Sequence, residues 1–209
     1  MLSKETLKLY LVTDRPLARG RNLEDIVKSA VEGGVSMVQL REKDISTRDF
    51  IALGTSLKKA LEGTGVPLII NDRVDVALGC DADGVHIGQS DMPYGTARRL
   101  LGPHKIIGLS VENMQQVAEA EELDVDYIGV SPVFSTPTKT DTAEPFGLDG
   151  LREAANASRH PIVAIGGINA SNAAAVMQAG ADGIAVVSAI VAADDPRLAA
   201  EDLSNRIRL

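Results

Sequence analysis

Two acidic residues follow predicted strands and could hold one metal ion together. Asp72 comes after the apolar run at 67–71, and Asp91 comes shortly after the run at 84–88. If these runs are neighbouring strands of a parallel sheet, they lie about 4.8 Å apart and both carboxylates can reach one hard cation. Mg2+ is bound in proteins by one or two carboxylates, together with water and substrate phosphate oxygens. The alternative, that both acids are helix caps or turn residues, stays open at this point.

Basic and amide side chains follow another predicted strand, in the segment MVQLREK. Strand side chains alternate, so Val38 and Leu40 share one face while Gln39, Arg41 and Lys43 share the other. If the aliphatic pair meets surrounding helices, the polar side chains point inward. An inward arginine is costly unless it meets an anion. It is expected either to pair with a buried carboxylate or to clamp phosphate or pyrophosphate, which a guanidinium binds bidentately.

A hydroxyl-rich loop follows the apolar run at 127–131. Threonine occupies every second position from 136 to 142, Pro137 restricts the backbone, and Lys139 adds one cation. Threonine hydroxyls can donate hydrogen bonds to anionic oxygens. The loop is therefore expected to cover a site that holds phosphate groups, although a solvated loop with chance threonines is the alternative.

Eight short β-rich runs must position these side chains. They lie at 9–13, 37–41, 67–71, 84–88, 106–110, 127–131, 161–165 and 183–187, and segments with helical spacing separate most of them. Apolar strands that alternate with helices predict a parallel sheet covered on both faces. Eight such units predict a single-domain (β/α)8 TIM barrel over residues 1–209. A doubly wound open sheet is the alternative, but the segment after the first run lacks the G-x-G-x-x-G pattern.

Glycines near the end of the chain indicate a phosphate site. TIM-barrel active sites lie at the C-terminal ends of the strands, and the last two strand–helix loops commonly bind phosphate through backbone N–H groups. Gly166 and Gly167 would let the backbone approach an anion, with a structural tight turn as the alternative. Asn71 and Ser110 end two other runs, where Ser110 is usually only a helix cap. His86 is expected to be a hydrogen-bonded core histidine.

Composition narrows the class of protein. The formal net charge is −8 and only 3% of residues are aromatic, which argues against a nucleic-acid surface and predicts an aliphatic core. The single cysteine, Cys80, excludes an internal disulfide and is expected to be buried. The sequence has no signal peptide or apolar run of about 18 residues, so we expect no membrane partner and a cytoplasmic location. The oligomeric state stays open, a homodimer included.

Seven segments in order resemble the thiamine-phosphate synthase family, and the resemblance covers nearly the whole chain. They are QLREK (39–43), IINDR (69–73), GVHIGQSD (84–91), GLSVEN (108–113), SPVFSTPTKTDT (131–142), AIGGIN (164–169) and GADGIAVVSAI (180–190). The resemblance implies a transferase that joins a hydroxymethylpyrimidine diphosphate to a hydroxyethylthiazole phosphate and releases pyrophosphate. Loss of pyrophosphate would come first and attack by the thiazole nitrogen second, with no general base required.

The resemblance also implies roles for individual residues. The pyrimidine diphosphate would be held by Gln39, Arg41, Lys43, Asn71, Ser110 and Lys139, of which Lys139, Arg41 and Ser110 would be catalytic. The thiazole phosphate would be held by Thr136, Pro137, Thr138, Gly167, Val187 and Ser188. The cofactor Mg2+ would be held by Asp72 and Asp91.

Three other functions compete with this prediction. A thiazole tautomerase-like isomerase would lack much of the diphosphate and metal apparatus, which is present here in Arg41, Lys43, Asp72, Asp91 and Lys139. A phosphosugar isomerase or epimerase would need a proton-abstracting pair at opposite strand ends. A non-catalytic ligand-binding barrel would need no chemistry at all. Release of pyrophosphate from the two substrates separates all of them.

Overall fold

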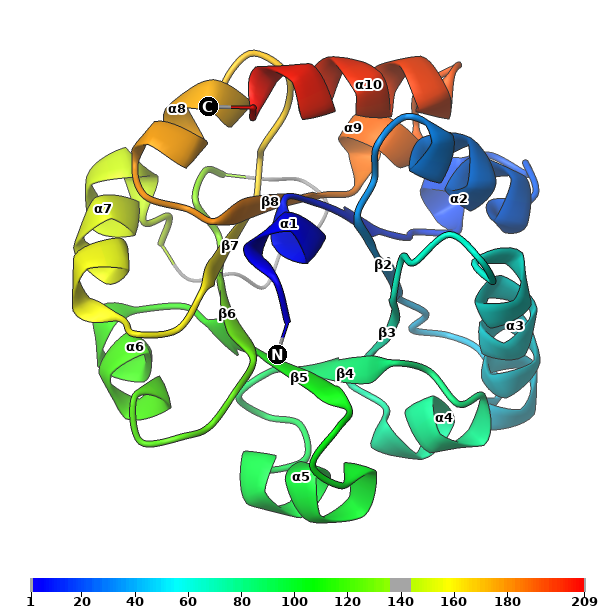
Figure 1. The fold of residues 1–209 in the computed structure, drawn as a ribbon, viewed down its shortest axis with the longest axis horizontal. Helices are drawn as coiled ribbons and strands as arrows, with labels where there is room; N and C mark the ends of the chain where they lie inside the picture. The colour runs from blue at the N-terminus through cyan, green and yellow to red at the C-terminus, as the bar shows by residue number, and fades with distance from the viewer. Residues whose placement is uncertain (1, 136–143, 209) are drawn as a thin grey trace.

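The computed structural model describes residues 2–135 and 144–208. Eight strands form a closed barrel in chain order (Figure 1), and every pair of neighbours, β8 and β1 included, is parallel. The strands are β1 (Leu9–Val12), β2 (Met37–Leu40), β3 (Leu68–Asn71), β4 (Gly84–Ile87), β5 (Ile106–Val111), β6 (Tyr127–Val130), β7 (Ile162–Ile165) and β8 (Gly183–Val186). The predicted TIM barrel is confirmed, and the open sheet is wrong.

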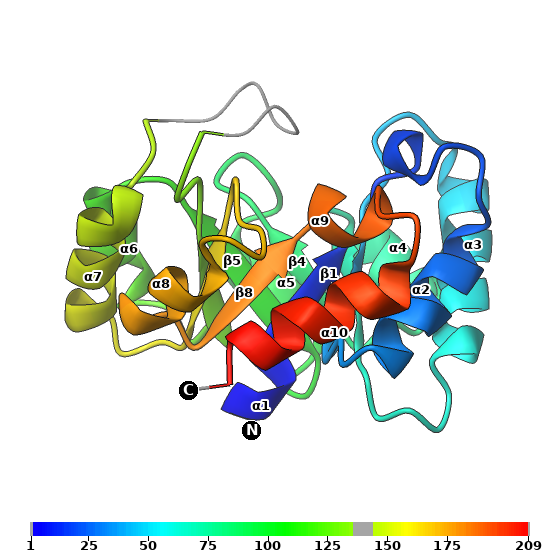
Figure 2. The same ribbon diagram turned by 90° about the horizontal axis from the view of Figure 1, so that it is seen from above.

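Helices surround the barrel as an outer ring (Figure 1). They are α2 (Leu23–Glu32), α3 (Thr47–Ala60), α4 (Val74–Gly79), α5 (Tyr94–Leu101), α6 (Met114–Ala120), α7 (Gly147–Ala157), α8 (Ala173–Gln178), α9 (Ser188–Val191) and α10 (Pro196–Arg206), with a 3-10 turn η1 (Pro16–Ala18) after β1. A short helix α1 (Lys4–Leu7) lies at the end of the barrel where the strands begin (Figure 2). The other end is left to the loops that follow the strands.

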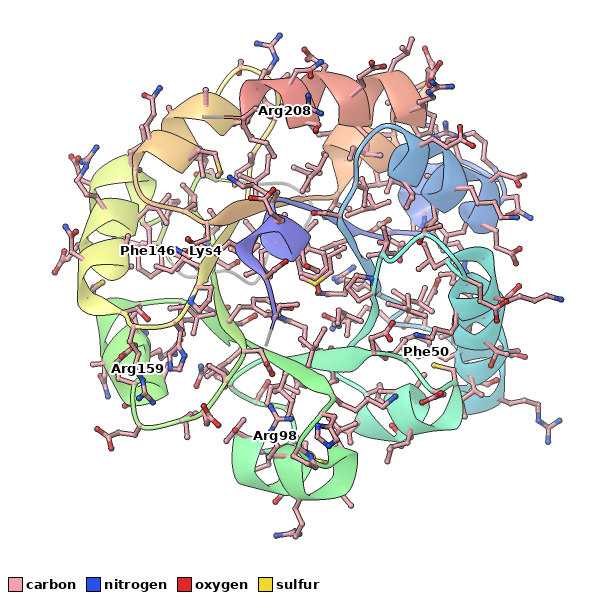
Figure 3. All side chains as sticks on the ribbon, viewed as in Figure 1. Lys4, Phe50, Arg98, Phe146, Arg159 and Arg208 are labelled. Carbon is pink, nitrogen blue, oxygen red and sulfur yellow. The ribbon has the colours of Figure 1, made fainter. Side chains whose placement is uncertain are left out.

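Alternation along the strands creates two separate apolar layers. Val38 and Leu40 pack outward into the layer between sheet and helices, where Figure 3 shows side chains such as Phe50 of α3. Met37 points inward, into a second cluster that fills the barrel; its buried members are Leu7, Tyr10, Val12, Met37, Ile69, Tyr127, Val163 and Ala185. The predicted facing of β2 is therefore confirmed, and its next inward position, Gln39, is 4% exposed.

One local expectation needs correction. The core is largely aliphatic as predicted, but two of the three tyrosines, Tyr10 and Tyr127, lie inside the barrel. Helix α3 is capped by Ser46, whose hydroxyl accepts from the Asp49 N–H at 3.1 Å, so Thr47 is the first helical residue. Cys80 is buried and free, as expected. Among the described residues, no helix combines the length and apolarity that crossing a membrane would need.

Candidate active site

A cavity of about 820 Å3 opens at the C-terminal ends of the strands. Its lining includes ten residues that the sequence selects for binding: Gln39, Arg41, Lys43, Asn71, Asp72, Asp91, Ser110, Gly167, Val187 and Ser188. Four further predicted residues, Thr136, Pro137, Thr138 and Lys139, lie outside the described residues. The fold thus brings residues from six strand ends or loops to one place, and their roles as ligands stay predictions.

The two predicted metal ligands lie close together. Burial is the largest cause that raises the pKa of Asp91, and the neighbouring Asp72 carboxylate raises it further, while the Gly88 N–H and Lys43 act against the shift. The Gly88 N–H donates to Asp91 at 2.7 Å, so this carboxylate also stabilises a turn, as the simpler interpretation proposed. Lys43 Nζ donates to Asp72 Oδ2 at 2.8 Å. Two adjacent carboxylates with one ammonium form a locally anionic oxygen site that fits a hard cation.

An unusual backbone conformation at Asp72 orients its side chain. Its φ is +64°, and its N–H donates to the His86 carbonyl of neighbouring β4 at 2.8 Å. Aspartate and asparagine tolerate this left-handed region better than most residues. The described residues include no group of three or more His, Cys, Asp or Glu side chains that could hold a metal. A cation at Asp72 and Asp91 would therefore need water or substrate oxygens to complete its shell, as Mg2+ usually does.

Arg41 pairs with a carboxylate, which is one of the two interpretations that the sequence left open. Its Nη1 is 3.4 Å from Asp14 Oδ2, which is the predicted pairing with a barrel carboxylate. Its backbone N–H donates to the buried Thr13 hydroxyl at 3.0 Å, which fixes the end of β2 against β1. One long contact uses little of a guanidinium with five N–H donors. Arg41 also lines the cavity, and the second interpretation, an anion clamp, stays a prediction.

Ser110 is a strand residue and not a helix cap. β5 continues to Val111, and the cap of α6 is Asn113, whose side chain accepts from the Gln116 N–H at 2.9 Å. Ser110 Oγ instead lies 2.8 Å from His86 Nε2. His86 is hydrogen-bonded as expected, but it is half-buried and lines the cavity.

The paired glycines after β7 have a packing role that the sequence did not indicate. Gly166 and Gly167 have φ values of +108° and +65°. A Cβ on Gly166 would lie 2.7 Å from Pro132 Cβ, and one on Gly167 would lie 2.8 Å from both Phe134 Cβ and the Ser135 carbonyl oxygen. These glycines therefore leave room for the described residues 132–135, which follow β6. Their positive φ values agree with the structural turn that the sequence left open as the alternative.

The resemblance to the thiamine-phosphate synthase family predicts that Gly167→Ala raises the KM for thiazole phosphate by about tenfold, equivalent to about 1.4 kcal/mol, because the new methyl group displaces Phe134 and Ser135. Gly63→Ala is the matched control, since Gly63 has a φ of +77° with nothing within 4 Å of an added Cβ. Both variants should lose about 1–2 kcal/mol of stability from left-handed alanine. Steady-state kinetics checks this, and a change confined to the pyrimidine diphosphate KM would show that the two subsites are reversed.

The end of β8 leads directly into a helix. Val187 follows the strand, and α9 begins at Ser188. The first N–H groups of any helix lack intrahelical partners and favour anions. Both residues line the same cavity as Gly167, which is the arrangement predicted for a phosphate group.

Three residues at or beside this cavity were not selected from the sequence. Asp14 pairs with Arg41, and the hydroxyls of Tyr10 and Tyr127 lie 3.0 Å apart at the floor of the cavity. Asp14 follows the first strand, just as Asp72 follows the third. Inspecting every strand end for acids, the first included, would have selected it.

Comparison with known proteins points to one family. A model of the family described as thiamine monophosphate synthase matches residues 9–190. The chain is 60% identical over 196 residues to thiamine-phosphate synthase of Albidiferax ferrireducens, covering 94% of this chain and 90% of that protein. It is 57% identical over 196 residues to the Vibrio parahaemolyticus enzyme of the same name, covering 94% and 96%.

Solved structures agree with the sequence comparison. Thiamine phosphate pyrophosphorylase from Pyrococcus furiosus superposes with a TM-score of 0.89 at 41% identity, covering 98% of this chain and 96% of that one. A 3-hexulose-6-phosphate synthase superposes with a TM-score of 0.70 at 19% identity, covering 96% and 99%. At that identity the second likeness concerns the fold alone.

Proposed function

Because the chain belongs to the thiamine monophosphate synthase family, we propose that the residues at the mouth of its barrel bind the two substrates of thiamine phosphate synthesis. The function is the transfer of a pyrimidinylmethyl group from its diphosphate to the nitrogen of the thiazole phosphate. The observation that carries the residue assignment is the convergence of Arg41, Lys43, Asp72 and Asp91 on the cavity that Gly167 also lines. The basic side chains and the carboxylates that could bind a metal thus lie in one cavity, where they could stabilise a departing pyrophosphate.

Each side of the cavity serves one substrate in this proposal. Arg41 and Lys43 bind the diphosphate, with Gln39, Asn71 and Ser110 around the pyrimidine. Gly167, Val187 and Ser188 receive the thiazole phosphate through backbone N–H groups. Thr136, Pro137 and Thr138 belong to the same phosphate subsite, by resemblance.

The chemistry proposed needs charge stabilisation more than proton transfer. The C–O bond to the diphosphate breaks with both electrons leaving on pyrophosphate, and the thiazole nitrogen lone pair then forms the C–N bond. Arg41 and Lys43 stabilise the negative charge that builds on the leaving group. Mg2+ held by Asp72 and Asp91 would, when bound, neutralise diphosphate oxygens. Lys139 is assigned to the same leaving group by resemblance.

Pyrophosphate release tests the proposal. The protein with both substrates and Mg2+ should form pyrophosphate and thiamine phosphate in equal amounts, and excess chelator should abolish both. Conversion of a thiazole phosphate isomer without pyrophosphate would favour a tautomerase-like isomerase. Binding without any conversion would favour a non-catalytic barrel. The cytoplasmic location and the homodimer stay predictions.

A further inference from the structure

Five polar side chains form one continuous hydrogen-bonded series across the barrel. Gln39 Nε2 donates to Tyr10 Oη at 2.7 Å, and the Tyr10 and Tyr127 hydroxyls are 3.0 Å apart. Tyr127 Oη is 2.9 Å from His86 Nδ1, and His86 Nε2 is 2.8 Å from Ser110 Oγ. We call this series, Gln39–Tyr10–Tyr127–His86–Ser110, the relay. It joins β2 to β5, and all its members line the cavity.

The direction of every hydrogen bond in the relay follows from its first member. The amide nitrogen of Gln39 can only donate, so the Tyr10 oxygen accepts there. Among the described residues, Tyr127 is the other partner of that hydroxyl, so the Tyr10 hydrogen points to Tyr127. The Tyr127 hydrogen then points to His86 Nδ1. A neutral imidazole that accepts at Nδ1 carries its proton on Nε2, and this N–H donates to Ser110.

Burial makes the reverse direction costly. Tyr10 is 1% exposed and Tyr127 is fully buried, and burial raises the pKa of both phenols, so both keep their hydrogens. If Tyr127 donated to Tyr10, the Tyr10 oxygen would receive two hydrogens, and its own would have no acceptor among the described residues. An unsatisfied buried donor is strongly unfavourable.

Two glycines hold the rings of the relay in place. A Cβ on Gly108 of β5 would lie 2.1 Å from Tyr127 Cζ, and one on Gly129 of β6 would lie 3.0 Å from His86 Cε1. The His86 and Tyr127 ring centroids are 5.5 Å apart. The rings fill space that only glycine leaves open, so the relay cannot shift without disturbing the barrel wall.

We propose that His86 is a positioning residue that fixes Ser110 as a hydrogen-bond donor toward the substrate. As the Nε2–H tautomer, His86 occupies an acceptor lone pair of the Ser110 hydroxyl and leaves the serine hydrogen for an acceptor atom of the pyrimidine diphosphate. Tyr127, whose hydroxyl hydrogen has His86 Nδ1 as its acceptor, sets that tautomer. The identity of the acceptor rests on the proposed function, whereas the tautomer does not.

Nitrogen-15 NMR of the substrate-free protein, labelled at histidine, tests the inference directly. His86 should show a pyridine-like Nδ1 and a pyrrole-like Nε2, assigned by their loss in His86→Gln. His160 provides an internal reference, because its Nε2 faces the Ala120 carbonyl at 3.0 Å and must carry a hydrogen there. The opposite pattern for His86, or averaged signals, would overturn the proposal.

Two matched variants test how the tautomer is set. Tyr127→Phe removes the donor to Nδ1 and should give a mixture of tautomers. Tyr10→Phe removes a hydroxyl from the same cluster but leaves Tyr127 with His86 as its acceptor, so the wild-type pattern should persist. An unchanged pattern in both, or the same change in both, would contradict the relay.

Kinetics then connects the relay to Ser110. Tyr127→Phe should lower kcat/KM for the pyrimidine diphosphate by about tenfold, the effect of one hydrogen bond. In a Ser110→Ala background, Tyr127→Phe should lower kcat/KM by less than about twofold, because Tyr127 acts through the Ser110 hydroxyl. An equal decrease of kcat/KM in both backgrounds would overturn the positioning role of His86. If the protein shows the predicted His86 tautomer but releases no pyrophosphate, the proposed function is contradicted. The hydrogen-bond directions of the relay are then still supported.

Discussion

Replacing Asp72 or Asp91 with asparagine is expected to lower kcat by about 10²–10³-fold and to raise the Mg2+ concentration needed for half-maximal rate. Each change removes one of the two carboxylates that would share the cation. Asparagine preserves shape in both cases, because it tolerates the left-handed backbone of Asp72 and can accept the Gly88 N–H that now donates to Asp91. The loss should therefore come from charge and not from misfolding.

The control for this prediction is Asp81→Asn. Asp81 also has a left-handed backbone, with a φ of +50°, and also pairs with a lysine, Lys105, at 2.5 Å. It lies in the loop before β4, away from the cavity lining. Activity should be unchanged in this variant. Calorimetric titration with Mg2+ gives a second readout, and wild-type titrations for Asp72→Asn and Asp91→Asn would refute the metal assignment.

The architecture was predictable because each of its signals is local. Alternation in β2 correctly separated Val38 and Leu40 from Gln39 and Arg41, since the pleat has a strict period of two. Parallel strands deliver their C-terminal ends to one rim, so residues after different strands could be assigned to one cavity without knowing any distance.

Contacts between side chains inside the barrel were harder to predict than the set of residues at the C-terminal ends of the strands. The contact between Tyr10 and Tyr127 joins residues 117 positions apart, and it depends on the closed order of strands and on the empty space at Gly108. A low aromatic content suggested an aliphatic core, yet these two rings supply polar atoms inside it. Applying the alternation rule to the first and sixth strands would have placed both side chains inward.

The glycines after β7 show a second limit of prediction from sequence. Sequence alone can indicate that Gly166 and Gly167 allow a close approach, but not what approaches. In the structure the neighbour is the segment from Pro132 to Ser135, which follows β6. The same residue type would suit a phosphate, a turn or a packed loop, and only tertiary contacts distinguish them.

Arg41→Met is expected to lower kcat/KM for the pyrimidine diphosphate by about 10²–10³-fold, because the guanidinium would face charge that grows as pyrophosphate leaves. Arg41→Lys should recover only part of the loss, since a point charge replaces a planar fork. Arg73→Met removes the same charge from an exposed pair with Asp75 and should leave activity unchanged. Initial rates at limiting pyrimidine diphosphate measure all three variants.

Asp14→Asn decides between the two roles that Arg41 can have. The carboxylate of Asp14 lies 3.4 Å from Arg41 Nη1 and also accepts the Leu17 N–H at 3.1 Å, a contact that asparagine can keep. If Arg41 served only to balance Asp14, removing either charge would be equally harmful. If Arg41 binds the diphosphate, Asp14→Asn should cost less than about tenfold, because the single long contact orients the guanidinium while its other donors still reach the substrate. Equal losses in Arg41→Met and Asp14→Asn would make the ion pair structural and remove Arg41 from the substrate site.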